Sequence, residues 1–341
     1  MRKITLGKTN LEVTKTAFGV LPLQRRRVED AVEILQTAKN SGINFFDTAR
    51  AYTDNEEKVG IAFRGCREDV IIATKTHASN LQEMKEHLKT SLQMLQTDYI
   101  DIYQFHNVKD VPKENEDMYK FMLELKEQGI IRHIGATSHS YDSAVEVVRC
   151  GLYDTLQYPI FCLSDEKDLG IIEMCKEYNV GLIAMKGMGG GLIDDAKIAF
   201  SFLDSYDNVA TIWGVQKKEE LLEFIELDKN PPLQDDVLKE KIAKYKSELG
   251  GDFCRGCGYC LSSCPVGIQI NNCARMSLLL RRAVWQSFVT DEWRQNMKMI
   301  DECIECRACT EKCPYSLDIP KLLKKNLADY NEFLASNGIS K

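Results

Sequence analysis

The sequence predicts an α/β protein in which a (β/α)8 TIM barrel precedes a small, mainly α-helical domain. Residues 1 to about 228 alternate short apolar runs with amphipathic stretches, as βα units with buried parallel strands do. Asn230-Pro231-Pro232 then interrupts the alternation. Most of the thirteen cysteines follow this break, in two blocks between residues 254 and 313.

The eight predicted strands are short, apolar and bounded by turn residues. They cover 13–20, 43–47, 70–74, 99–105, 130–136, 155–158, 180–185 and 209–213. The helices between them repeat apolar residues every three or four positions and cover 28–40, 56–63, 81–95, 116–127, 142–149, 167–178, 197–203 and 218–227. A doubly wound open sheet is the competing fold, but its usual glycine-rich turn after the first strand is absent from this sequence.

The break in the pattern divides the chain into three parts. We expect the barrel over residues 1–230 and a linker over 231–252, which contains one charged helix at 235–249. The cysteine-rich domain is expected over 253–341. A chain of 341 residues suits one large and one small domain.

Composition argues against partners such as nucleic acid and membranes. The formal net charge is −7, and no long lysine and arginine cluster provides a basic surface. The N-terminus lacks the apolar stretch of a signal peptide, and no run of about 20 apolar residues could span a bilayer. We therefore expect a cytoplasmic protein that binds neither nucleic acid nor membrane.

Two cysteine blocks share the spacing C-x2-C-x2-C-x3-C-P. The first contains Cys254, Cys257, Cys260 and Cys264, and the second contains Cys303, Cys306, Cys309 and Cys313. In this pattern three thiolates surround one face of an iron–sulfur cubane, and the cysteine before the proline ligates the other cluster. The spacing therefore predicts two [4Fe–4S] clusters. Cys313 completes the cluster of the first block, and Cys264 completes the cluster of the second.

Zinc is the alternative metal for these cysteines, but zinc sites usually use pairs of ligands rather than three in a row before a Cys-Pro. The other five cysteines are interpreted as small, often buried hydrophobic residues. They are Cys66, Cys150, Cys162, Cys175 and Cys273. Helices are predicted at 274–282 and 285–299, between the blocks, and this long segment resembles the α-helical ferredoxins.

Four polar residues end predicted strands or follow them directly. Asp47 ends the second strand and Tyr52 follows it, Lys75 ends the third, and His106 ends the fourth. Barrel enzymes place their chemistry at the C-terminal ends of the strands. These four residues are therefore the candidate catalytic group.

The same four residues, in this order and context, make residues 1 to about 225 resemble the aldo-keto reductases. The resemblance implies that a nicotinamide gives hydride to a carbonyl while Tyr52 donates a proton to the oxygen. Lys75, held by Asp47, is expected to lower the pKa of Tyr52 from about 10. His106 is expected to orient the carbonyl oxygen by a hydrogen bond.

The resemblance also implies contacts to the cofactor's nicotinamide end. Ser138 and Gln157 stand where the family binds the carboxamide, although the family often has Ser-Asn where this chain has Ser138-His139. Met185 stands where an aromatic ring is expected to stack, and Lys186 follows it.

The phosphates are expected to bind in the loop before the last barrel helix. Gly214, Val215, Gln216 and Lys217 form this loop, and backbone amides leading into a helix favour anions. Glu220 stands where an arginine would bind a 2′-phosphate. The sequence therefore leaves NADH, NADPH and a flavin open as occupants.

Both halves together resemble the iron–sulfur-containing aldo-keto reductase-like oxidoreductases of anaerobes. One hypothesis is an enzyme that reduces a carbonyl, or oxidises an alcohol, with the clusters as an electron relay to a ferredoxin or flavoprotein partner. The alternative is an electron-transfer or redox-sensing protein whose barrel binds flavin or no nicotinamide. An apolar mouth built from Tyr52, Phe105, Tyr158 and Phe161 would accept many aldehydes or ketones.

Overall fold

The computed structural model contains the strands and helices that the alternating pattern predicts. The strands of the barrel are β3 (Thr16–Gly19), β4 (Phe45–Asp47), β5 (Ile71–Thr76), β6 (Ile100–Phe105), β7 (Ile131–Thr137), β8 (Thr155–Pro159), β9 (Gly181–Met185) and β10 (Val209–Gly214). The helices between and after them are α1 (Val28–Asn40), α2 (Asn55–Ala62), α3 (Leu81–Leu95), α4 (Asp117–Glu127), α5 (Tyr141–Arg149), α6 (Glu166–Glu177), α7 (Ala196–Asp204) and α8 (Lys218–Lys229). Short 3-10 helices form η1 (Gly7–Thr9), η2 (Leu21–Arg25) and η3 (Arg67–Asp69).

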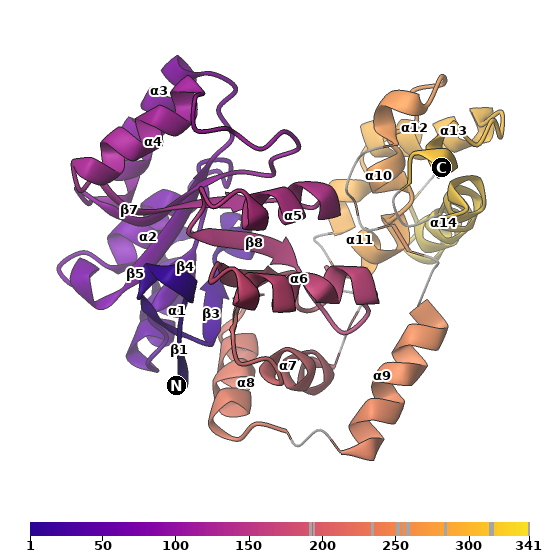
Figure 1. The fold of residues 1–341 in the computed structure, drawn as a ribbon. Coiled ribbons are helices and arrows are strands. Elements are labelled where there is room, and N and C mark those ends of the chain that lie inside the picture. Colours follow the sequence, from indigo (N-terminus) through magenta and orange to yellow (C-terminus); the bar gives the residue numbers. More distant parts are fainter. Residues whose placement is uncertain are drawn as a thin grey trace. The chain divides into compact units, whose positions relative to one another are not determined.

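The barrel strands are parallel and close in the order β10-β3-β4-β5-β6-β7-β8-β9 (Figure 1). The predicted (β/α)8 fold is confirmed. The structure describes the chain except residues 191, 192, 194, 233, 234, 250–252, 255, 257–259, 283, 284, 314–316, 340 and 341.

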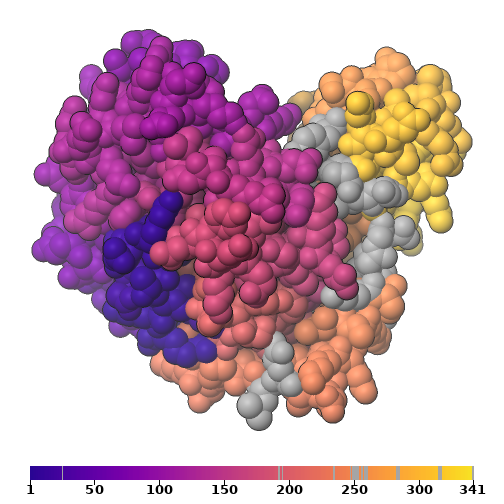
Figure 2. All heavy atoms as spheres, in the orientation of Figure 1, coloured from indigo at the N-terminus to yellow at the C-terminus, as the bar shows by residue number. Residues whose placement is uncertain are grey.

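The first predicted strand is wrong in its extent. Residues 13–20 were expected as one strand, but they divide into β2 (Glu12–Thr14) and the barrel strand β3. β2 pairs antiparallel with β1 (Lys3–Thr5), which the sequence analysis missed. Leu6 and Val13 are fully buried among the apolar residues of the barrel core, so this hairpin covers one end of the barrel. Its outer side is the indigo patch on the surface in Figure 2.

The C-terminal part is helical, as predicted. It contains α9 (Asp236–Leu249), η4 (Leu261–Ser263), α10 (Ile270–Cys273), α11 (Met276–Arg282), η5 (Trp285–Phe288), α12 (Asp291–Lys298), η6 (Met299–Glu302), α13 (Ala308–Glu311) and α14 (Ile319–Ser336). By their contacts, residues 1–189 and 193–239 form one compact unit, and residues 240–341 with 190–192 form a second. The division falls inside α9.

Two features of the second unit differ from the sequence analysis or were missed by it. The single helix predicted at 285–299 is broken, because Thr290 caps a new helix by accepting from the backbone N–H of Trp293 at 3.4 Å. The long helix α14 was not predicted, although Asp318 and Pro320 are typical of a helix start. Among the described residues, no helix is long and apolar enough to cross a membrane.

The packing of α2 against α3 generates a stability prediction. A Cβ at Gly60 would lie 2.2 Å from the carbonyl oxygen of Met94. Gly60→Ala is therefore expected to lower the free energy of unfolding of the barrel by about 1–3 kcal/mol. Gly170→Ala, in α6, is the matched control because nothing lies within 4 Å of its Cβ position. Thermal unfolding should show a lower Tm for the first variant only, and equal Tm values would contradict the packing argument.

Candidate active site and cluster-binding cysteines

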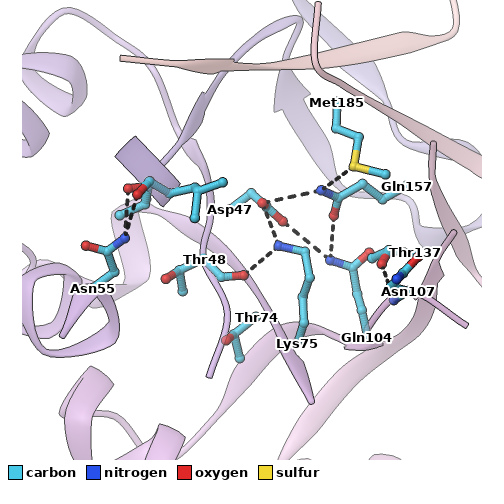
Figure 3. A network of polar contacts seen from close by, with 12 residues as sticks. Asp47, Thr48, Asn55, Thr74, Lys75, Gln104, Asn107, Thr137, Gln157 and Met185 are labelled. Carbon is cyan, nitrogen blue, oxygen red and sulfur yellow. Dashed lines mark hydrogen bonds and ion pairs between the residues drawn. The ribbon is translucent and has the colours of Figure 1, made fainter. Parts of the chain in front are cut away.

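A buried ion pair joins the ends of two neighbouring barrel strands. The Lys75 ammonium, on β5, donates to Oδ2 of Asp47, on β4, at 2.7 Å. It also donates to the carbonyl oxygen of Thr48 at 2.7 Å. Asp47 is 2% exposed and Lys75 is 1% exposed. The two strands pair in parallel, so both residues lie at the rim that bears the C-terminal ends (Figure 3).

Two glutamines extend this network across the barrel interior. Nε2 of Gln104 lies 3.1 Å from Oε1 of Gln157, and both amides lie 3.5 Å from the Asp47 carboxylate (Figure 3). Gln104 was missed, although a polar residue inside an apolar strand was an available signal. Gly135 makes room for it, because a Cβ there would lie 2.9 Å from Cγ of Gln104.

The loop between β4 and α2 carries the predicted catalytic tyrosine and is held by a second ion pair. Arg50 pairs with Glu56, which is 1% exposed. The other carboxylate oxygen of Glu56 accepts from the Thr74 hydroxyl at 2.6 Å. Asn55 donates to the carbonyl oxygen of Val20 at 2.9 Å. None of these residues was expected at the site, but they tie the loop to β5 and to the chain after β3.

All four candidate catalytic residues come together at this rim. Nζ of Lys75 lies 4.9 Å from the centroid of the Tyr52 ring. The rings of Tyr52 and His106 meet edge to face, with centroids 5.8 Å apart and an interplanar angle of 82°. A carbonyl oxygen between these two rings would therefore meet a phenol and an imidazole together.

The pKa of Tyr52 was expected to fall below about 10, but in this structure it is raised. Burial raises the pKa of Tyr52, and the charge of Lys75 only partly opposes that effect. Burial alone would lower the pKa of Lys75, but Asp47 and Tyr52 outweigh it and raise that pKa. Burial likewise raises the pKa of Asp47, against the charge of Lys75. At neutral pH Tyr52 is therefore protonated and Lys75 is charged.

His106 is held in its neutral form. Burial, followed by the charges of Lys75 and His77, lowers its pKa to about 3. A neutral imidazole can donate one hydrogen bond and accept another, whereas an imidazolium can only donate. His106 therefore suits a role in orienting an oxygen atom rather than protonating it.

Ser138 and Gln157, the residues predicted to bind the cofactor's carboxamide, already have polar partners within the protein. The Ser138 hydroxyl donates to the carbonyl oxygen of Val108 at 2.9 Å and accepts from the backbone N–H of Ser140 at 3.0 Å. The Gln157 amide faces Asp47 and also lies 3.8 Å from Sδ of Met185. A ligand at this rim would have to share these partners.

The predicted phosphate loop presents a carboxylate to its own amides. Oε2 of Glu220 accepts from the backbone N–H of Gln216 at 2.7 Å and of Lys217 at 3.2 Å. These amides lie directly before α8 (Lys218–Lys229), where an anion is favoured. The Glu220 carboxylate therefore caps the helix in this structure, as in a capping box, and a phosphate at these amides would have to replace it.

Two residues proposed for the apolar mouth point away from it. Successive strand residues face opposite sides, and the interior side of β6 and β8 belongs to Gln104 and Gln157. Tyr158 instead donates to Oδ1 of Asp168, on α6, at 2.6 Å. Phe105 packs edge-on against Tyr153, with ring centroids 6.2 Å apart. The prediction that Phe105 and Tyr158 line the substrate mouth is therefore wrong.

Four cysteines from both blocks line one pocket of the second unit. They are Cys264, Cys303, Cys306 and Cys309, the set predicted for the second cluster. The other walls include the apolar side chains of Ile268 and Leu323. Thiolates in an apolar enclosure are the donor set of an iron–sulfur cluster, and a cubane needs four of them. These residues fit the predicted group.

Equivalent residues of the two blocks have a left-handed backbone. Gly256 has φ +70°, and Glu305, at the equivalent position, has φ +53°. The N–H of Gly256 points to Sγ of Cys254 at 3.3 Å. A Cβ at Gly256 would lie 2.5 Å from the guanidinium of Arg275, so that side chain would have to shift. Cys257 lies outside the described residues.

The five scattered cysteines do not form a third group. Cys162, Cys175 and Cys273 are fully buried, while Cys150 is exposed and Cys66 is partly exposed. Burial raises the pKa of the Cys175 and Cys273 thiols to about 12. Buried thiols of this kind are unreactive packing residues.

The barrel with its Lys75–Asp47 rim has the architecture of a barrel enzyme with its polar groups at the C-terminal ends of the strands. Residues 4–225 match the aldo/keto reductase family, and residues 253–318 match a 4Fe-4S dicluster domain. The first match covers more than half of the chain. The chain therefore belongs to the aldo/keto reductase family and carries a C-terminal iron–sulfur domain.

Curated relatives agree with this assignment. The chain is 32% identical over 215 residues to an uncharacterized oxidoreductase, YqkF, of Bacillus subtilis, a match that covers 57% of this chain and 67% of the relative. It is 29% identical over 211 residues to L-galactose dehydrogenase of Arabidopsis thaliana, covering 56% and 66%. The matches thus span about two thirds of each relative.

Solved structures share the fold. The holo form of an aldo-keto reductase from Bacillus halodurans gives a TM-score of 0.63 at 24% identity, covering 72% of this chain and 96% of that protein. An aldo/keto reductase from Klebsiella pneumoniae, in complex with NADP and acetate, gives 0.62 at 20% identity, covering 72% and 94%.

The low pKa of His106 predicts how this residue titrates. In an unfolded chain its pKa is about 6.5, so between pH 6.5 and pH 3 the unfolded state binds a proton that the folded state does not. Acidification through this window should therefore destabilise the barrel. NMR of ¹³C-labelled histidine, assigned with His106→Gln, should show no His106 titration between pH 5 and pH 8. A midpoint near 6.5 would contradict the burial argument.

Proposed function

We propose that the barrel reduces a carbonyl, or oxidises the corresponding alcohol, with hydride exchanged with a nicotinamide. The observation that carries this proposal is the buried Lys75–Asp47 pair at 2.7 Å beside Tyr52 and His106. Hydride adds two electrons to the carbonyl carbon, and the oxygen then needs one proton to become a hydroxyl.

Each residue of the group has one task in this scheme. Tyr52 is protonated at neutral pH and gives its phenolic proton to the oxygen. Lys75 stabilises the phenolate that this step leaves, because its charge opposes the burial penalty. Asp47 holds Lys75 in place. His106, neutral, orients the oxygen by a hydrogen bond.

The cysteines are proposed to hold two [4Fe–4S] clusters with crossed ligation. Cys254, Cys257, Cys260 and Cys313 hold one, and Cys264, Cys303, Cys306 and Cys309 hold the other. The pocket lined by the last four supports this pairing, because Cys264 comes from the first block. The clusters carry single electrons whereas a nicotinamide moves two as hydride, so a flavin would have to split the hydride before the clusters could relay electrons to a ferredoxin or flavoprotein partner.

A second candidate function follows from Glu220. Its carboxylate occupies the α8 amides that a dinucleotide phosphate would use. This favours an iron–sulfur electron-transfer or redox-sensing protein whose barrel binds flavin or no nicotinamide. The two candidates differ in nicotinamide binding, which fluorescence or calorimetry measures directly.

Tyr52→Phe tests the proton donor. Loss of the phenolic proton should reduce carbonyl reductase turnover by roughly 100- to 10,000-fold, the usual range for general acid catalysis. Tyr99→Phe is the matched control, because Tyr99 packs against Arg67 and Arg132, away from the four residues of the site. Steady-state kinetics of proteins with equal iron content give the comparison. Turnover that survives in Tyr52→Phe would refute the assignment.

Glu220→Ala tests the obstruction of the phosphate loop. Freed amides at the start of α8 should bind NADH and NADPH about tenfold more tightly, with the larger gain for NADPH. Glu219→Ala removes the same charge from the same turn without freeing the amides. Quenching of protein fluorescence measures both affinities. Unchanged affinity in Glu220→Ala would mean that the dinucleotide does not use this loop.

Cysteine variants test the crossed ligation. Anaerobically prepared protein should contain about eight iron atoms per chain. Cys264→Ser and Cys306→Ser should perturb the same electron paramagnetic resonance signal, and Cys254→Ser should perturb the other. Cys150→Ser, at an exposed barrel cysteine, should perturb neither. If Cys264→Ser and Cys254→Ser changed one signal together, ligation would be uncrossed.

A further inference from the structure

Two histidines and a glutamate form a cluster that the proposed function does not use. His77 lies in the loop after β5, two residues beyond Lys75, and Glu83 and His87 lie one turn apart on α3. One potential ligand atom from each of the three lies within 4.8 Å of the others. Apart from the cluster-binding cysteines, these three side chains are close enough together to hold a metal ion.

The spacing of the three side chains is close to that of a metal site. Nε2 of His87 lies 3.8 Å from Oε1 of Glu83. The rings of His77 and His87 have centroids 4.5 Å apart and are tilted by 44°. Ligands at 2.0–2.1 Å from a tetrahedral zinc ion lie about 3.3 Å apart, so small side-chain rotations bring these atoms into range.

Neighbouring groups already fix the orientation of two ligands. The Thr76 hydroxyl lies 2.9 Å from Nδ1 of His87, which directs Nε2 toward Glu83. Oε2 of Glu83 accepts from the backbone N–H of Ser79 at 2.7 Å and from its hydroxyl at 2.9 Å, which leaves Oε1 toward His87. Hydrogen bonds of this kind orient metal ligands in known sites.

The start of α3 is equally well ordered. Oδ1 of Asn80 accepts from the backbone N–H of Glu83 at 2.9 Å and caps the helix. Glu83 and His87, four residues apart on this helix, therefore face the same side. The third member, His77, is exposed on the loop after β5.

We propose that His77, Glu83 and His87 bind a divalent transition metal, with zinc as the ion that best suits two imidazoles and one carboxylate. Three protein ligands leave the fourth position of a tetrahedral zinc ion open to water. The metal would fasten the loop that follows Lys75 to the first turns of α3. Thiolates take no part, so this site is chemically distinct from the cluster-binding cysteines.

Zinc titration of the cluster-loaded protein tests the site. Under anaerobic conditions, calorimetry should show about one zinc ion bound per chain, with iron content unchanged and a Tm raised by several degrees. His77→Ala and His87→Ala should each weaken zinc binding by at least about tenfold, a typical loss for a ligand or its support. Glu83→Gln should weaken it in the same direction.

Glu86→Gln is the matched control on the same helix. Glu86 is exposed and accepts from the Gln82 amide at 2.9 Å, so its removal changes local charge without removing a ligand. Zinc binding equal to that of the unaltered chain is expected there. Equal binding in the His77 and His87 variants would overturn the proposal, and so would zinc uptake accompanied by loss of iron. Because the readout is zinc rather than turnover, failure here leaves the carbonyl reductase proposal standing.

Discussion

The buried Lys75–Asp47 ion pair is the constraint on which the barrel's functional rim depends. Two charges removed from water are stable only when the geometry is close and the remaining polar atoms are paired. Here the carbonyl oxygen of Thr48 and the amides of Gln104 and Gln157 supply those partners. These partners come from β6, β8 and the residue after β4, while Lys75 lies on β5. Four strands of the barrel therefore contribute to the ion pair and its surroundings.

In the second unit, cysteine side chains rather than strand ends form the candidate site. Equivalent residues of the two cysteine blocks, Gly256 and Glu305, share a left-handed backbone, and cysteines of both blocks face one pocket. Burial lowers the pKa of Arg275, and the nearby Cys254 opposes that effect. A cluster ligated by four thiolates is an anion, so if Cys254 ligates one as proposed, the buried guanidinium of Arg275 would offset part of its charge.

The spacing of apolar residues along the chain predicted the features that depend on neighbouring residues alone. The bounds of α1 and α3 follow from apolar spacing and agree with the structure. The run from Val13 to Val20 is interrupted by the polar Thr14-Lys15-Thr16, and pairing of the first part with β1 shows that the strand divides there. Glu220 was noticed as a charge in an unusual place, but its contact with the α8 amides is a matter of side-chain direction. The Tyr52 pKa depends on how burial compares with the charge of Lys75, and a linear sequence contains neither depth nor distance.

The Glu220 carboxylate affects how dissolved anions can bind to this loop. The Glu220 side chain is only four residues from the Gln216 amide that it caps. It therefore competes with any dissolved anion at a very high effective concentration. If a dinucleotide uses this loop, as proposed, its phosphate must displace the Glu220 carboxylate before it docks. A binding event of this kind exchanges one anion for another at the helix end. The affinity for the dinucleotide would therefore depend on how much more strongly the amides bind phosphate than they bind the Glu220 carboxylate. The start of α8 would be capped by an anion with or without the ligand.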